Sequence, residues 1–389
     1  SQLSIKKSRG VLSFPAFGWF LVYSLLLVFS VIINSTNPRD AISFYRITLL
    51  SYLVFIAFYN FQFTEKKVWN FYFFFKRVLI LQIIASLLKL FLIGFAEKPV
   101  GTLSMQGGAI TTIFSLMIVA ILFSYYFFHK RDKKVLWWLL LFLIIPIVNI
   151  KRAIWFMAPL IILLSYIYYN HYYGKGVRSI MNKLIPVVLL MGIIFYFGVR
   201  LNRTLNPERK IWGSFDIEYV FNYAENYNYQ DENEARTGLV HGRMAVFEYA
   251  LFQSLTEREL KNVFFGYGIE HFIGAGHRSD FFRSTLGVGS RGSMSGLVQT
   301  MWAAGILVAI ALFAFYVQFL FKLRKMRKMS KSMHHHLFIC ISIMFTLIII
   351  FDYMIYTSGF IGSLQLNIIY FAFVAISLKK TNENILNRV

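Results

Sequence analysis

Long apolar stretches separated by short polar segments run through most of the chain and predict a bundle of membrane-spanning helices. A helix needs roughly 20 mostly apolar residues to cross the hydrocarbon core of a bilayer. About ten windows meet this requirement: 15–34, 41–60, 71–95, 108–128, 135–150, 153–170, 184–199, 293–321, 335–356 and 360–378. We therefore expect an all-α polytopic membrane protein, in which 135–170 forms a helical hairpin split by Lys151 and Arg152.

One segment interrupts the apolar pattern. Residues 200–292 contain 11 Lys and Arg and 12 Asp and Glu, with polar runs such as ENYNYQDENEART. This predicts a soluble, mainly helical loop subdomain outside the membrane. It would separate an N-terminal bundle of about seven helices (1–199) from three C-terminal helices and a cytoplasmic tail (293–389). An amphipathic helix is predicted over 240–260. Its apolar stripe consists of Val240, Met244, Phe247, Leu251 and Leu255.

The formal charge of +22 arises from 40 Lys and Arg against 18 Asp and Glu, in a chain that is 57% hydrophobic. That apolar content excludes disorder and argues against a soluble nucleic-acid-binding protein, so no nucleic-acid partner is expected. The cations concentrate at the termini and in every second short loop, which together contain 21 Lys and Arg but only three Asp and Glu. Because cytoplasmic loops are enriched in Lys and Arg, both termini are predicted to be cytoplasmic and the large loop outside. The chain begins with Ser, so further helices upstream stay an open interpretation.

Several cations lie where membrane proteins normally avoid them. Arg46 falls inside the second span, and Lys151 and Arg152 lie at the outer tip of the hairpin. Arg200 and Arg291 bracket the large loop where it meets the membrane. Arginine suits bidentate contact with phosphate, so these residues are candidates for binding a lipid-linked pyrophosphate at the outer surface. The alternative is that Arg46 snorkels and that the loop arginines pair with the 12 local acids.

Motifs of soluble nucleotide-dependent and metal-dependent enzymes are missing from the sequence. It has no G-x-x-x-x-G-K-[ST], no H-E-x-x-H and no D-x-D pair, so neither a cofactor nor a metal is predicted. His334, His335 and His336 look like a metal-binding tract. They follow the basic segment KLRKMRKMSKSM, however, and a basic segment at the membrane interface explains them better.

Three local patterns occur in an order typical of one family. They are NIKRAIWFMAPLIILL, then TGLVHGRMAVFEYALFQ with NVFFGYGIEHF, and finally SMSGLVQTMWAAGILVAIALF, where the chain re-enters the membrane. Together with the large loop, these resemble the O-antigen polymerase and O-antigen ligase superfamily over about residues 108–321. Each pattern is weak alone, and the specificity of the resemblance comes from their order.

The resemblance implies a GT-C-like membrane glycosyltransferase in the bacterial cytoplasmic membrane. Its substrates would be undecaprenyl-pyrophosphate-linked glycans, as donor and as acceptor, and a chain-length regulator is a possible protein partner. Arg152 matches the hairpin arginine of the family, and Arg243 matches the arginine of its Gly-Arg motif. Both would hold the pyrophosphate and stabilise it as the leaving group, without a metal.

The sequence departs from the ligase pattern at one position. Ligases carry a His-Asn pair at the start of the helix after the loop, where this chain has Met294 and Ser295. This favours a polymerase for O-antigen or capsule and leaves Glu270, His271 and His277 as candidate bases. A ligase and a peptidoglycan polymerase of the shape-and-division family remain alternatives. A flippase is another, although such transporters need coupling acids and the spans contain only Asp352.

Overall fold

The protein, seen in a computed structural model, is a helical membrane protein. The structure describes residues 14–61, 64–93, 101–102, 108–128, 134–135, 137–138, 152–174, 184–201, 206, 218–219, 222, 225, 229, 239–240, 242–256, 259–272, 279–288, 294–330, 332–357 and 362–379. For some of these residues, Arg152 included, it describes the backbone alone. Over these ranges the regular secondary structure is helical, apart from one isolated bridge between Val240 and Val288.

Helices occupy the predicted windows, except that 135–150 lies almost wholly outside the described residues. The long helices are α1 (Phe17–Ile33), α2 (Pro38–Asn60), α3 (Glu65–Ile93), α4 (Gly108–Phe128), α6 (Arg152–Tyr172), α8 (Leu184–Leu201), α14 (Ile306–Met329), α15 (Met333–Phe351) and α16 (Leu364–Leu378). Among the described residues, five segments are long and apolar enough to cross a membrane: Pro38–Asn60, Lys66–Lys89, Ile110–Phe128, Ile306–Met329 and Met333–Tyr356. The all-α membrane class is thereby supported, whereas the count of ten spans stays a prediction.

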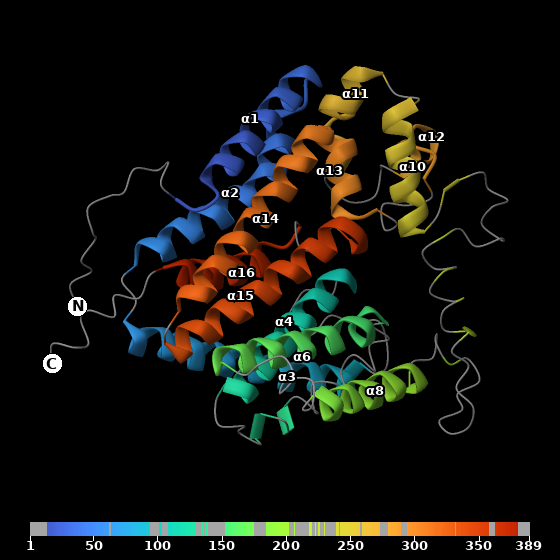
Figure 1. Ribbon diagram of the computed structural model, residues 1–389. Helices are drawn as coiled ribbons and strands as arrows, with labels where there is room; N and C mark the ends of the chain where they lie inside the picture. Colours follow the sequence, from blue (N-terminus) through green and yellow to red (C-terminus); the bar gives the residue numbers. More distant parts are fainter. Residues whose placement is uncertain are drawn as a thin grey trace.

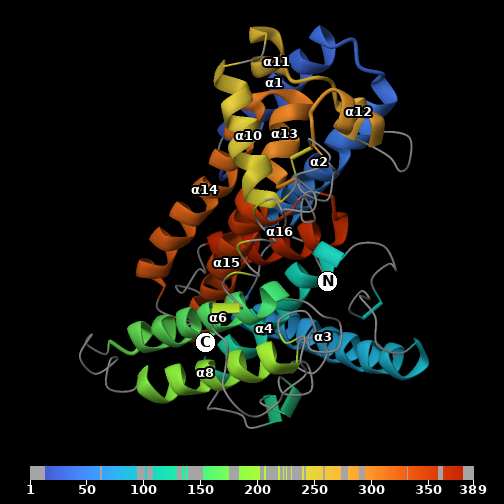
Figure 2. The same cartoon turned by 90° about the vertical axis from the view of Figure 1, so that its right-hand side faces the viewer.

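The helices form two groups on either side of α15 (Figures 1 and 2). One group contains α3, α4, α6 and α8, and the other contains α1, α2, α14 and α16. Buried aromatic rings fill the interfaces. Tyr52, for example, stacks on Phe20 of α1 at 4.3 Å and meets Phe371 of α16 edge-on. Because spanning helices meet lipid that is as apolar as leucine, such close packing is what holds them together.

Side-chain pairs fix the directions in which α4 and α6 run. Ser124 on α4 lies 3.4 Å from Ser165 on α6, and the ring of Phe128 lies 5.4 Å from that of Tyr169. Both pairs are separated by 41 residues, so the two helices run parallel in constant register. Continuing that register places Ile113 opposite Ile154, and both side chains are fully buried. The first turn of α4 therefore lies beside the first turn of α6.

Helix α15 runs in the opposite direction to α6. His336, in its first turn, packs against Tyr172 at the end of α6, with ring centroids 4.8 Å apart. Eight residues further on, Met344 lies 3.2 Å from Ser165. The end of α15 is therefore next to the start of α6. Tyr353, near the end of α15, also donates a 2.9 Å hydrogen bond to the carbonyl of Ala309 near the start of α14.

These directions define two ends of the bundle. At one end, which we call the Arg243 end, α1 and α15 finish and α4, α6 and α14 begin. At the other, the Arg327 end, α14 finishes and α3 and α15 begin, as the 4.2 Å contact between Trp69 and His334 shows. Arg327 itself lies 4.7 Å over the ring of Tyr168, near the end of α6. Every helix named here runs in the direction that the alternation of the predicted spans requires.

One sequence prediction for the C-terminal half is wrong. The window at 293–321 is not one helix, because α13 (Gly296–Ala304) ends at Gly305 and α14 begins after it. The φ angle of Gly305 is +101°, and a Cβ there would collide with the backbone carbonyl of Phe264. No other residue type fits this position without strain, so the glycine breaks the helix.

The predicted stripe on the amphipathic helix is only partly buried: Val240 and Phe247 pack half-buried against the core, and Leu255 does not. The helix, α10, spans Arg243–Thr256 and buries Val246, Ala250, Gln253 and Ser254, while Leu255 is highly exposed. The described parts of the large loop continue with α11 (Leu260–Phe265), η3 (Ile269–Phe272) and α12 (Ser279–Ser284). Their buried side chains, such as Phe272 and Leu286, belong to the same hydrophobic core as the spanning helices.

Candidate functional site

Arg243 opens α10 at the Arg243 end of the bundle. It follows Gly242, whose φ of +87° turns the chain into the helix. The half-buried guanidinium lies over the ring of Tyr356, with Cζ 4.3 Å from the ring centroid. Such a cation–π contact is worth about 0.5–2 kcal/mol. Arg243 therefore reaches from the large loop onto the end of a spanning segment.

The Tyr356 hydroxyl extends the cluster to α4, because it lies 3.4 Å from Oγ1 of Thr112. Thr112 is in the first turns of α4, and the register described above puts the start of α6 alongside. Arg152 is the first residue of α6. The backbone thus brings the positions of the two predicted pyrophosphate-binding arginines, Arg152 and Arg243, to the same part of the Arg243 end.

Helix α15 ends beneath this cluster in an irregular turn. Residues Asp352–Tyr356 form a π-helix, and the buried Asp352 accepts a 2.5 Å hydrogen bond at Oδ1 from Oγ1 of Thr357. The carbonyl of Thr357 in turn accepts a 3.0 Å hydrogen bond from the amide of Gly296, at the start of α13. Non-helical backbone at membrane depth is tolerated where protein covers it, and π-turns are frequent at functional sites.

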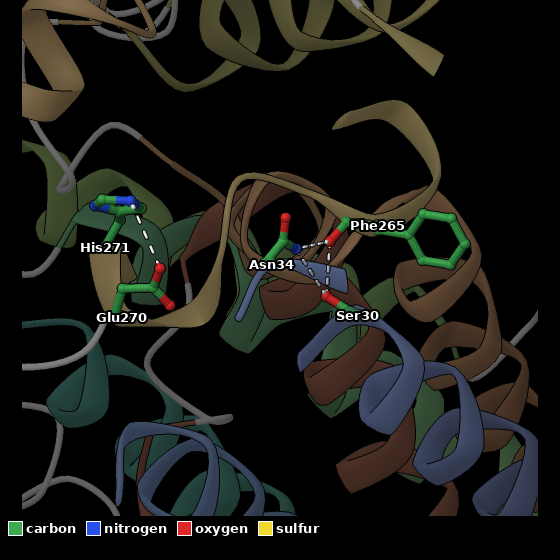
Figure 3. Close-up of polar contacts among 5 residues, drawn as sticks. All are labelled: Ser30, Asn34, Phe265, Glu270 and His271. Atoms are coloured by element: carbon green, nitrogen blue, oxygen red, sulfur yellow. Dashed lines mark hydrogen bonds and ion pairs between the residues drawn. The ribbon is translucent and has the colours of Figure 1, made fainter. Parts of the chain in front are cut away.

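Glu270 and His271 form a second cluster on η3, with His271 Nε2 and Glu270 Oε1 3.8 Å apart (Figure 3). The imidazole stacks on the ring of Phe281 at 4.0 Å and 6°, and about a third of each polar side chain is exposed. Gly268, at φ +108°, leaves room for the carboxylate of Glu270. The pair is an ion pair only when His271 is protonated.

Helix α13 (Gly296–Ala304) packs against the elements that carry both clusters: α10 and the π-helix Asp352–Tyr356 for the first, and η3 for the second. The position expected to carry the ligase histidine is Met294, which is buried, and Ser295 caps α13 by accepting a hydrogen bond from the Val298 amide. Those two positions have packing and capping roles. The carboxylate of Glu248, in the middle of α10, accepts a 3.2 Å hydrogen bond from the hydroxyl of Tyr229. That bond raises the pKa of the tyrosine above its ordinary value.

The remaining predicted site residues belong to neither of the two clusters or lie outside the described residues. Arg46 is exposed on α2. Arg200 is buried in the last turn of α8, 5.3 Å over the ring of Tyr196, and its carbonyl accepts a 2.7 Å hydrogen bond from Asn206. Helix α8 packs on α6. Lys151, His277 and Arg291 lie outside the described residues.

Sequence reasoning missed Tyr356 and Thr112 as members of the site. An aspartate within an apolar stretch was the available signal, because Asp352 marks the point where the helix becomes irregular. The histidine tract lies at the opposite end of the bundle, where His335 bonds the Ser377 carbonyl at 3.0 Å. Among the described residues, no three His, Cys, Asp or Glu side chains gather as metal ligands.

Comparison with known proteins adds no relative to this description. Neither a protein-family model nor a curated protein matches the chain.

Proposed function

We propose that the chain is a membrane glycosyltransferase that joins lipid-pyrophosphate-linked oligosaccharide repeat units into a surface polysaccharide. The carrier would be undecaprenyl pyrophosphate, and the reaction would take place at the outer face of the bacterial cytoplasmic membrane. The observation that carries this proposal is the contact of Arg243 with Tyr356, whose hydroxyl reaches the first turns of α4. The register of α4 and α6 brings the start of α6, and with it the backbone position of Arg152, to the same end of the apolar bundle.

The chemistry follows from what arginine does with phosphate. Two guanidinium groups at the membrane surface can each form paired hydrogen bonds to a diphosphate while its lipid tail stays in the bilayer. In the reaction, a hydroxyl of the acceptor glycan attacks the anomeric carbon of the donor sugar. The bond from that carbon to the pyrophosphate oxygen then breaks. Arg152 and Arg243 stabilise the negative charge that develops on the leaving group.

The attacking hydroxyl must lose a proton during this step. His271 is the described group best suited to accept it, because Glu270 would stabilise the imidazolium that results. Tyr356 has a different task. Its ring holds the guanidinium of Arg243 in place, so it is a positioning residue.

Complementation of a deletion strain tests the proposal. We expect Arg243→Ala to abolish long surface polysaccharide, and Arg243→Lys to be nearly as defective because lysine lacks the bidentate geometry. Tyr356→Leu should reduce the amount of long chains by about 2–30-fold, the range set by a cation–π contact of 0.5–2 kcal/mol. Tyr356→Phe keeps the ring and should retain most of the activity. The matched control is Arg283→Ala, which removes an exposed arginine of α12.

The gel pattern distinguishes the alternatives. Loss of a polymerase leaves single repeat units attached to the lipid core, whereas loss of a ligase leaves none. Loss of a flippase would also leave none, because no repeat units would reach the outer face, and loss of a peptidoglycan polymerase would leave the surface glycan pattern unchanged. Normal long chains in the Arg243→Ala strain, at wild-type expression of the protein, would show that the assigned role of this residue is wrong.

A further inference from the structure

The segment from α10 to α11 exposes four large apolar side chains. Phe252 is 55% exposed and Leu255 82% on α10, while Leu260 is 73% and Phe264 40% exposed on α11. Residues three or four apart project from the same side of a helix, so each helix presents one apolar face. These faces belong to the large loop, which the charge pattern predicts to be soluble. Exposed side chains of this size and number need a partner other than water.

Helix α11 is fastened to the ends of two apolar helices. Ser30 and Asn34, at the end of α1, donate hydrogen bonds of 2.6 and 2.8 Å to the carbonyl of Phe265 (Figure 3). Gly305 lets the start of α14 approach the backbone of α11, and Gly266 does the same toward α13. Contacts to the backbone of α11, from side chains of α1 on one side and from α13 and α14 on the other, therefore fix its position relative to the bundle.

The ends of α1 and α14 that hold α11 also expose apolar side chains. Ile32 and Ile33 are exposed in the last turn of α1, and Leu307 and Ile310 in the first turns of α14. On the spanning segment α14, such side chains face lipid. The apolar surface of the membrane-embedded helices is thus continued, around the Arg243 end, by α11. Lys261, exposed between Leu260 and Phe264, can place its ammonium among lipid phosphates.

From these contacts we propose that the α10–α11 segment is a membrane-interface element, whose exposed apolar side chains enter the acyl-chain boundary of the adjacent leaflet. The large loop would then rest on the bilayer beside the bundle and would not stand clear of it. Amphipathic helices bind membranes in this way, with their apolar faces buried about 5–10 Å below the headgroups. This inference does not depend on the proposed enzymatic function.

Spin labels at single cysteines test the position of the segment. The chain has one cysteine, Cys340, which is fully buried in α15 and can be replaced by alanine. Leu255→Cys and Leu260→Cys are labelled with a nitroxide in the full chain, reconstituted in phosphatidylethanolamine–phosphatidylglycerol vesicles. Oxygen reaches labels in the bilayer, and a soluble nickel chelate reaches labels in water. We expect an oxygen-to-nickel accessibility ratio several-fold above that of a water-exposed label.

Two reference positions calibrate the ratio. Ile310→Cys reports a lipid-facing site on α14, and Arg283→Cys reports an exposed polar site on α12. Ratios at 255 and 260 that match position 310 support the proposal, and ratios that match position 283 overturn it. Labels that neither reagent reaches also overturn it, because protein or a second copy of the chain would then cover the segment. Phe252→Cys and Phe264→Cys provide the same readout if either first variant fails to fold.

Discussion

Replacing Gly305 by alanine perturbs the junction at which α11, α13 and α14 meet. The residue has a φ of +101°, which side chains with a Cβ rarely adopt, and the added Cβ would overlap the Phe264 carbonyl and the Phe265 amide. Both obstacles are backbone atoms, so a side-chain rotation cannot relieve the overlap. The substitution must therefore move α11 away from the start of α14 or distort the turn.

The expected cost combines two terms. Holding a non-glycine residue in a sparsely populated backbone conformation costs about 1–3 kcal/mol. Forcing extra atoms into a well-packed site costs a further 1–3 kcal/mol or so. The sum is a destabilisation of about 2–6 kcal/mol, which is large compared with the effect of most surface substitutions.

The matched control is Gly192→Ala in α8. Gly192 is in a helix, has no unusual φ, and an added Cβ there meets no atom within 4 Å. Alanine should stabilise that helix by about 0.5–1 kcal/mol. The assay is the fraction of detergent-purified protein that stays monodisperse after heating. We expect a lower midpoint for Gly305→Ala than for wild type, and an equal or higher one for Gly192→Ala. Equal midpoints for the two variants would refute the close backbone contact at Gly305.

Three further predictions concern the same end of the bundle. Ser30→Ala combined with Asn34→Ala removes both donors to the carbonyl that ends α11, and should lower stability by about 1–3 kcal/mol in the same heating assay. Ile113→Cys with Ile154→Cys, in a cysteine-free background, should form a disulfide on brief oxidation because α4 and α6 run in parallel register. The same Ile113→Cys paired with a cysteine two turns further along α6 should not form one. Asp352→Asn keeps an acceptor for the neighbouring threonine and should preserve the heating midpoint. Asp352→Leu should destabilise the protein by about 1–3 kcal/mol and so lower the midpoint. Equal midpoints for the two Asp352 variants would contradict the structural role of that hydrogen bond.

The sequence was a good guide to where apolar helices lie and a poor guide to which side of a helix is buried. Val240, Met244, Phe247, Leu251 and Leu255 were grouped as one apolar stripe of an amphipathic helix. In a membrane protein the lipid-facing side is equally apolar, so periodicity cannot separate the two faces. The exposure of Leu255 shows that this was the failure in α10. Only the tertiary contacts of Val246 and Ala250 identify the buried side.

The break at Gly305 was invisible for a related reason. The apolar composition continues unchanged through AAGILVAI, and glycine is common inside membrane helices. The contact with the backbone of α11 explains the break, and that contact joins residues 40 positions apart in the chain. Tyr356 was overlooked because tyrosines frequently occur at the ends of spanning helices, so its position alone carried no signal. Its role became visible once Arg243 was found over its ring.

We infer an orientation for the site from the pairing of the helices and the position of the basic residues taken together. Pairings between helices place the end of α14 and the start of α3 at the Arg327 end. The basic side chains of these two segments therefore lie at that end: Lys66, Lys67, Lys322, Arg324, Lys325, Arg327 and Lys328. Since cytoplasmic ends of spanning helices are the ones enriched in Lys and Arg, we infer that the Arg327 end is cytoplasmic. By the same inference, Arg243 and the start of α6 lie on the outer side, where an arginine opposes the charge trend.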